Sequence, residues 1–198
     1  PAGPAGSPGP VGAPGPAGSP GNDGPAGPPG GQGATGGYIA HSVGESYGGG
    51  IVFYVYDGGQ HGLIAATANQ SSSTNWYAGS NSTTLAKGDG INGGKANTFI
   101  IISSQGLGNG NTYAARICNE YKVTVNGVTY SDWYLPSKHE LNLLYLQRDD
   151  VGNFGTNTYW SSTEQTDAKA FKQGFSTTGS KFAGLKSTNS GVRAVRAF

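Results

Sequence analysis

The chain has 198 residues, of which 36 are Gly and 11 are Pro, and its formal net charge at pH 7 is +1. These two residue types are unevenly placed, because residues 1–36 hold 13 Gly and 10 Pro while the rest of the chain contains only Pro136. The remaining residues are rich enough in apolar and aromatic side chains for one domain with its own core. The composition therefore excludes a wholly fibrous and a wholly disordered protein, and no apolar run reaches the 18 residues typical of a membrane span.

Glycine occupies every third position from Gly3 to Gly36, twelve times without interruption. This pattern is typical of the collagen triple helix, in which only Gly fits at the axis where three polyproline II strands meet. We therefore predict that residues 1–36 form a collagen-like stalk and that the protein is a homotrimer. At about 3.1 Å per residue, the stalk would extend for roughly 110 Å.

Residues 37–198 are predicted to form a globular C-terminal ligand-binding and trimerisation domain. The apolar run Gly50–Tyr56, followed by the turn residues Asp57–Gly59 and a second run at 62–67, predicts a β-hairpin. A long loop rich in Gly, Asn and Ser is expected at 70–94. The fold class is predicted to be α+β, with a mixed, mostly antiparallel sheet and about three helices.

The three helices are predicted at 95–105, 112–121 and 137–148. Ser137 and Glu140 have the spacing of a capping box at the start of the third helix. Between the second and third helices, Asn126-Gly127 is flanked by alternating Val and Thr, which is typical of a two-residue hairpin turn. The last strand is expected at 192–198, and Cys118 is expected to be a buried, unreactive thiol.

Four segments occur in a characteristic order: GGGIVFYVYDGGQHGLIAA at 48–66, DWYLPSKHELNLLY at 132–145, YWSSTE at 159–164 and VRAVRAF at 192–198. Together they resemble the C-terminal domain of the collagen-like adhesin family of Legionella, in which a collagen arm also precedes this domain. The resemblance implies a bacterial trimer, extracellular or on the cell surface, that binds sulfated glycosaminoglycans through basic surface residues and supports host attachment and biofilm formation. The second and third segments are also similar to the C-type lectin-like fold, although this chain lacks the EPN or QPD tripeptide and the paired disulfides of that group.

The basic residues are concentrated at the C-terminus. Residues 165–198 carry six Lys or Arg against one acidic residue, whereas residues 37–164 carry six against nine. Clustered cations bind a polyanion by releasing its condensed counterions, and three linked copies multiply such contacts. The predicted glycan-binding residues are these six cations and two aromatic residues of the 70–94 loop: Lys169, Lys172, Lys181, Lys186, Arg193, Arg196, Trp76 and Tyr77.

Arg193 and Arg196 are three residues apart, which places them on opposite faces of a strand. We therefore expect one of them to be buried beside a carboxylate such as that of Glu164. The aromatic pair Trp76 and Tyr77 either stacks on sugar rings or covers the core. By contrast, the two Trp residues of the family segments, Trp133 and Trp160, are expected to pack inside.

Nothing in the sequence assembles a catalytic site. The three histidines, His41, His61 and His139, fit no metal-ligand spacing, and Cys118 lies in no nucleophile motif. The Gly clusters lack the Lys-Ser/Thr of a phosphate-binding loop. Four aspartates are more typical of exposed acids than of a calcium loop: Asp57, Asp89, Asp149 and Asp150. We predict no enzyme activity, no cofactor, no metal and no nucleic-acid partner.

Two other functions fit the same sequence. In the first alternative, the C-terminal domain only nucleates the triple helix and sets its register. In the second, it is the receptor-binding tip of a phage tail or of a spore filament. The chain begins in the middle of a repeat and without an initiator Met, so we expect it to be a piece of a longer protein.

Overall fold

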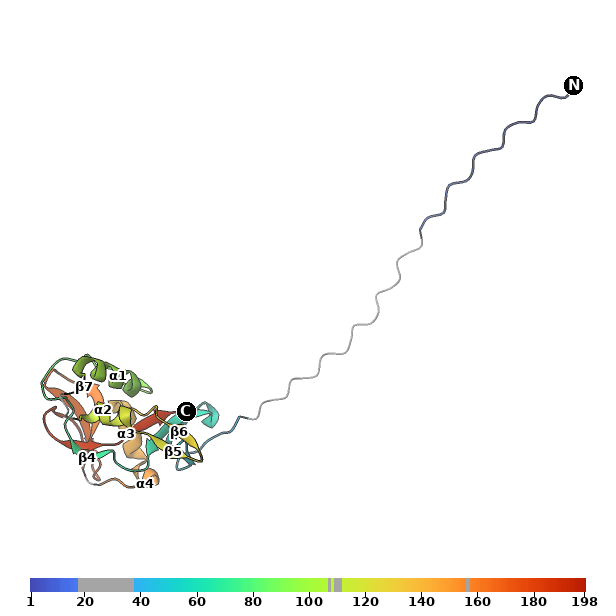
Figure 1. Ribbon diagram of the computed structural model, residues 1–198. Helices are drawn as coiled ribbons and strands as arrows, with labels where there is room; N and C mark the ends of the chain where they lie inside the picture. Colours follow the sequence, from blue (N-terminus) through green and yellow to red (C-terminus); the bar gives the residue numbers. More distant parts are fainter. Residues whose placement is uncertain (18–37, 107, 109–111, 156) are drawn as a thin grey trace. The chain divides into compact units, whose positions relative to one another are not determined.

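The structure is a computed structural model that describes residues 1–17, 38–106, 108, 112–155 and 157–198 (Figure 1). The chain divides into two units, Pro1–Gly36 and Gly37–Phe198. The described part of the first unit, residues 1–17, is exposed and contains no helix or strand. A Cβ atom added at any of its five repeat glycines from Gly3 to Gly15 would meet no atom within 4 Å. Contacts within one chain therefore do not explain why these five positions are Gly. The rest of the predicted stalk lies outside the described residues.

The second unit has an α+β fold, as predicted. Its described helices are α1 (Gly93–Gln105), α2 (Ala114–Glu120), α3 (Lys138–Leu146) and α4 (Arg148–Val151), with a short 3-10 helix η1 (Asp57–Gly59). The first three correspond to the predicted helices to within two residues at each end, whereas α4 was not predicted. The capping box is confirmed, since the Ser137 side chain accepts from the backbone N–H of Glu140 while the Glu140 side chain accepts from that of Ser137.

The strands form two sheets and a separate hairpin. The four-stranded sheet has the order β1 (Ser46–Tyr47), β2 (Gly50–Tyr56), β3 (His61–Ala66) and β11 (Val195–Ala197). The five-stranded sheet has the order β4 (Ser71–Thr74), β10 (Ser190–Val192), β7 (Thr158–Glu164), β8 (Lys169–Gly174) and β9 (Lys181–Leu185). The hairpin of β5 (Val123–Val125) and β6 (Val128–Tyr130) turns at Asn126-Gly127, both with positive φ, as predicted. Among the described strand pairs, only β10 with β7 is parallel.

The end of the chain differs from the sequence prediction. Instead of one strand at 192–198, β10 ends at Val192 in the five-stranded sheet and β11 begins at Val195 in the other sheet. Strand β4, which lies inside the predicted 70–94 loop, exists because Thr74 pairs with Ser190 of β10. A polar tetrapeptide gives no local signal for a strand whose partner lies more than a hundred residues away.

Apolar side chains of the four-stranded sheet point alternately into two buried clusters. Val52 and Ile64 face one cluster, while their neighbours Phe53 and Leu63 face the other. Both faces of the sheet are therefore covered, which explains why β2 reads as a continuous apolar run. The first cluster includes Cys118, Trp133 and Trp160, so their predicted burial is confirmed, and burial raises the pKa of the Cys118 thiol.

In the described residues, no helix combines the length and apolar character required to cross a membrane.

Candidate functional site

Lys186, predicted to contact a ligand, is instead fully buried. Its Nζ lies 2.6 Å from Glu164 Oε1, donates to the Ser82 carbonyl oxygen at 2.9 Å, and stands 4.5 Å from the ring centroid of Trp76. Trp76 is buried as well, and its indole N–H donates to the Ser161 carbonyl oxygen at 2.8 Å. The prediction of Lys186 and Trp76 as surface contacts is therefore wrong, because both complete an internal polar cluster that only the fold assembles.

Glu164 is the centre of this cluster. Besides Lys186, its carboxylate accepts hydrogen bonds from the backbone N–H and hydroxyl of Thr84 and from the backbone N–H of Leu85. Burial alone would raise the pKa of Glu164, but the hydrogen bonds from Lys186 and the loop lower it overall. The cluster attaches the loop before α1 to β7 and thereby contributes to the fold instead of to a surface site.

Arg193 is also fully buried, and it lies in the two-residue link between β10 of one sheet and β11 of the other. Its guanidinium donates to Asn69 Oδ1 at 2.9 Å and to the carbonyl oxygens of Ala66 and Asn153 at 2.8 and 2.7 Å. Burial lowers the pKa of Arg193 to about 10. One arginine of the pair is thus buried, as expected, but its partners are neutral oxygens and not Glu164. Its predicted role in ligand contact is wrong.

Arg196 has the carboxylate partner that was expected for one of the two arginines. It binds Asp132 through two hydrogen bonds of 2.7 and 3.1 Å, and its side chain is 12% exposed. Burial would raise the pKa of Asp132, but the hydrogen bonds from Arg196 lower it overall. Asp132 therefore neutralises the charge of Arg196. The same ion pair attaches β11 to the segment that precedes α3.

Three predicted cations remain, and all lie on β8 and β9 at one edge of the five-stranded sheet: Lys169, Lys172 and Lys181. Across the described ranges, none of them has a carboxylate within 4.0 Å. Lys169 and Lys181 are exposed and share one face, because Lys181 pairs with Gln173, four residues along β8 from Lys169. Lys172 lies on the other face. We call these two strands and their three lysines the β8–β9 edge.

Lys172 is half-buried and held in a defined position. Its Nζ lies 4.8 Å from the ring centroid of Trp160 and within 3.4 Å of the hydroxyls of Thr188 and Ser190. Its stem crosses Gly184 of β9 so closely that a Cβ atom there would overlap it. Burial lowers the pKa of Lys172. The result is an ammonium group oriented by neutral partners, and no carboxylate in the described part of the chain lies within 4.0 Å of it.

Phe182 is an exposed aromatic residue of this edge that the sequence analysis missed. It pairs directly with Lys172 in the β8–β9 register, and the Lys172 Nζ is 5.5 Å from its ring centroid. The ring is 42% exposed. An aromatic face beside an ammonium group presents the two contacts that an anionic sugar ring requires. Within residues 165–198, the ligand-contact residues were predicted from charge alone, so Phe182 was not included. Its position next to Lys181 in the sequence was the signal that could have indicated it.

Tyr77 lines a polar hollow of about 320 Å³ beside β4, at the other edge of the five-stranded sheet. The other lining residues are mainly small, hydroxyl or amide side chains: Ser73, Thr74, Asn75, Ala78, Gly79, Thr112 and Asn189. Asn189 lies between Thr188 and Ser190, whose hydroxyls bind Lys172. Strands β4 and β8 are three strand spacings apart, or about 14 Å. The fold therefore does not place Tyr77 on the β8–β9 edge, and the hollow reaches toward Lys172 only through Asn189.

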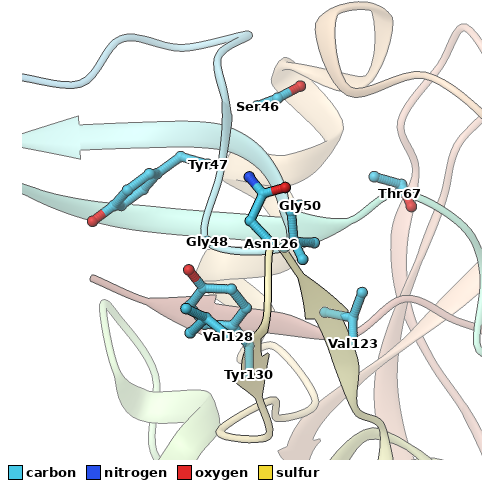
Figure 2. A pocket seen from close by; sticks show the side chains of 11 residues that line it. Ser46, Tyr47, Gly48, Gly50, Thr67, Val123, Asn126, Val128 and Tyr130 are labelled. Carbon is cyan, nitrogen blue, oxygen red and sulfur yellow. The ribbon is translucent and has the colours of Figure 1, made fainter.

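A second, more apolar groove of about 540 Å³ lies between the β1–β2 turn and the β5–β6 hairpin (Figure 2). Tyr47 forms one side, and Val128 and Tyr130 project from the hairpin on the other. Gly48 and Gly49 have positive φ, which lets the chain turn beneath these side chains. A Cβ atom at Gly49 would contact Val123 and Tyr130, so the open shape of this groove depends on glycine.

The described part of the chain contains no group of three or more His, Cys, Asp or Glu side chains that could hold a metal ion. No family model matches this sequence, and no curated protein is significantly similar to it.

Proposed function

We propose that the protein is a trimeric, collagen-stalked adhesin whose head binds sulfated or otherwise polyanionic polysaccharides at the β8–β9 edge. The observation that carries the proposal is the set of three lysines that have no carboxylate within 4.0 Å among the described residues, one of which, Lys172, pairs with the exposed Phe182. Of the other three cations of residues 165–198, Lys186 and Arg193 are buried and Arg196 is paired with Asp132. Binding would therefore use Lys169, Lys172 and Lys181 in place of the full set of six.

The chemistry of this edge favours a linear polyanion over a small anion. Lys169 and Lys181 stand on one face and Lys172 on the other, so the cations follow the edge of the sheet and do not converge on one point. A chain with repeated sulfate or carboxylate groups can contact them in sequence while a sugar ring covers Phe182. Each contact releases counterions, so the affinity depends steeply on salt.

The stalk supports the avidity that such weak contacts need. The uninterrupted Gly-X-Y repeat has a physical reason only in a triple helix, which brings three heads onto one stem. A long polysaccharide that binds one head then meets the other two at high effective concentration. A bacterial cell-surface or secreted location and a role in host attachment and biofilm formation follow as parts of the same proposal.

The test compares two double variants of the full chain with the same loss of charge. Lys169→Gln/Lys181→Gln removes two cations of the β8–β9 edge, while Lys95→Gln/Lys122→Gln removes two exposed lysines elsewhere on the head. Heparin affinity is measured by titration at several salt concentrations. We expect the first variant to lose about tenfold in affinity, with a salt slope reduced by about 2 per head, and the control to change little.

Equal losses in both variants would show that heparin responds only to net charge and would overturn the assignment to this edge. If the trimeric protein does not bind heparin even in dilute buffer, the adhesin function itself is wrong. That result would favour the alternative in which the head only registers the stalk. Sedimentation of each variant verifies that the trimer is intact.

A further inference from the structure

Two bulky apolar side chains at the start of the head are largely exposed among the described residues. Tyr38 is 79% exposed and Ile39 is 76% exposed, although both follow the collagen-like repeat by only a few residues. Burying an exposed side chain of this size stabilises an assembly by more than a tenfold change in its equilibrium constant. Burial of Tyr38 and Ile39 against a second copy of the chain would therefore stabilise an assembly, because a single head leaves both side chains exposed.

The apolar groove described above lies close to this segment. The ring of His41 stacks on that of Tyr47 at a centroid distance of 3.8 Å, and Tyr47 forms one side of the groove. Tyr38 is three residues from His41, so its backbone lies within about 10 Å of it. On the opposite side of the groove, Val125 and Val128 are 43% and 52% exposed.

The collagen-like repeat indicates what fills the groove. If residues 1–36 form a triple helix, as the proposed function requires, three copies of the Tyr38–Ile39 segment emerge together at its end. Each segment is then within reach of a neighbouring head. A head-to-tail contact repeated three times closes into a ring without leaving an unpaired surface.

We propose that Tyr38 and Ile39 of each copy pack into the groove of the next copy, against Tyr47, Val128 and Tyr130. The contact joins the three heads to one another through the residues that follow the repeat in the sequence. It also leaves the β8–β9 edge of each head without a role in assembly.

The test is disulfide cross-linking in the full chain. The double variant Ile39→Cys/Val128→Cys places one thiol on the segment and one in the groove, while the native Cys118 is buried and does not interfere. Under mild oxidation we expect covalent trimers on a non-reducing gel. The single variant Val128→Cys is expected to remain a single chain on the gel, because its thiols lie in separate grooves.

A disulfide formed within one chain would show that the segment packs on its own head and would overturn the proposal. Absence of cross-links in a protein that sediments as a trimer would overturn it as well, while leaving the proposed adhesin function intact. If the wild-type chain sediments as a single copy, both the inference and the trimeric adhesin are wrong.

A second measurement does not depend on disulfide geometry. We expect Tyr38→Ser/Ile39→Ser and Val128→Glu each to weaken trimer association by about tenfold or more in sedimentation equilibrium. All three residues are exposed in the single chain, so the head remains folded. The control Leu146→Ser changes another exposed apolar residue, at the end of α3, and is expected to have no effect. Equal trimer affinity in all variants contradicts the inference.

Discussion

The Nζ of Lys186 lies 2.6 Å from Oε1 of Glu164, and both side chains are fully excluded from solvent. The two residues come from β7 and from the turn after β9, and they are 22 positions apart in the sequence. Removing water from two charges costs free energy that only their mutual attraction and further hydrogen bonds offset. Both conditions are met here, since Glu164 also accepts from Thr84 and Leu85, and Lys186 also donates to Ser82.

Breaking this pair from one side should be strongly destabilising. We expect Lys186→Met to lower the free energy of unfolding of the head by about 3 kcal/mol, because the buried Glu164 loses the ammonium group at 2.6 Å and keeps only the half-exposed Lys87, 3.8 Å away, as a counter-ion. Urea denaturation followed by tryptophan fluorescence measures the change. The exposed Lys181→Met serves as the control and should stay within about 0.5 kcal/mol of the wild type. A similar small effect for Lys186→Met would contradict the role of the pair.

The acid stability of the head should depend on the carboxylates whose folded pKa is lowered. Glu164 and Asp132 have folded pKa values below the ordinary values of 4.5 and 3.8. Their contribution to stability is therefore fully present above those values and is lost as the pH falls below them. We expect the free energy of unfolding to decrease between pH 5 and pH 3, and Asp132→Asn to show a shallower decrease. An unchanged slope in Asp132→Asn would disprove the contribution of its pair with Arg196.

Glu140 should respond to pH in the opposite sense. Burial raises its pKa even though it accepts hydrogen bonds from Tyr134 and three backbone N–H groups. A group with a raised folded pKa binds its proton more tightly in the folded state, so its contribution decreases as the pH rises through the range above 4.5.

The same carboxylate joins the starts of α1 and α3, so its replacement should destabilise the head. Glu140→Gln keeps the size of the side chain but substitutes an NH₂ donor for an oxygen that accepts from backbone N–H groups of Asn92, Gly94 or Ser137. We expect a loss of about 2–3 kcal/mol in the free energy of unfolding. Glu120→Gln, on the surface of α2, is the matched control. Equal stability of the two variants would exclude this role for Glu140.

Lys172 offers a test of the proposed site that leaves every charge in place. In Gly184→Ala, the new methyl group occupies the path of the Lys172 stem and displaces its ammonium group from Phe182 and Trp160. We expect heparin affinity to fall about threefold, because the oriented contact is lost while the charge remains. The control Gly174→Ala places a methyl group on β8 where the nearest atom is 3.8 Å away. If both variants bind heparin like the wild type, the orientation of Lys172 does not matter for binding.

Several features of the fold were predictable because their interactions are local. The capping box joins Ser137 to Glu140 over three residues, and the hairpin at Asn126-Gly127 depends on two residues that tolerate positive φ. The burial of Trp133 and Trp160 was expected because both lie in the segments that resemble the adhesin family, and it is confirmed. The two-residue gap between β10 and β11 was not predictable, because the strands on either side of Arg193 and Ala194 pair with different sheets.

The sequence alone determined the division into a Gly-X-Y segment and an α+β head, the three main helices and the concentration of cations near the C-terminus. Only the tertiary structure decided which of those cations are available to a ligand. Lys186, Arg193 and Arg196 meet partners 22, 127 and 64 residues away, whereas Lys169 and Lys181 stay exposed on the sheet edge. Charge is a property of each residue, but burial and pairing arise from contacts between distant segments, and these exist only once the chain has folded.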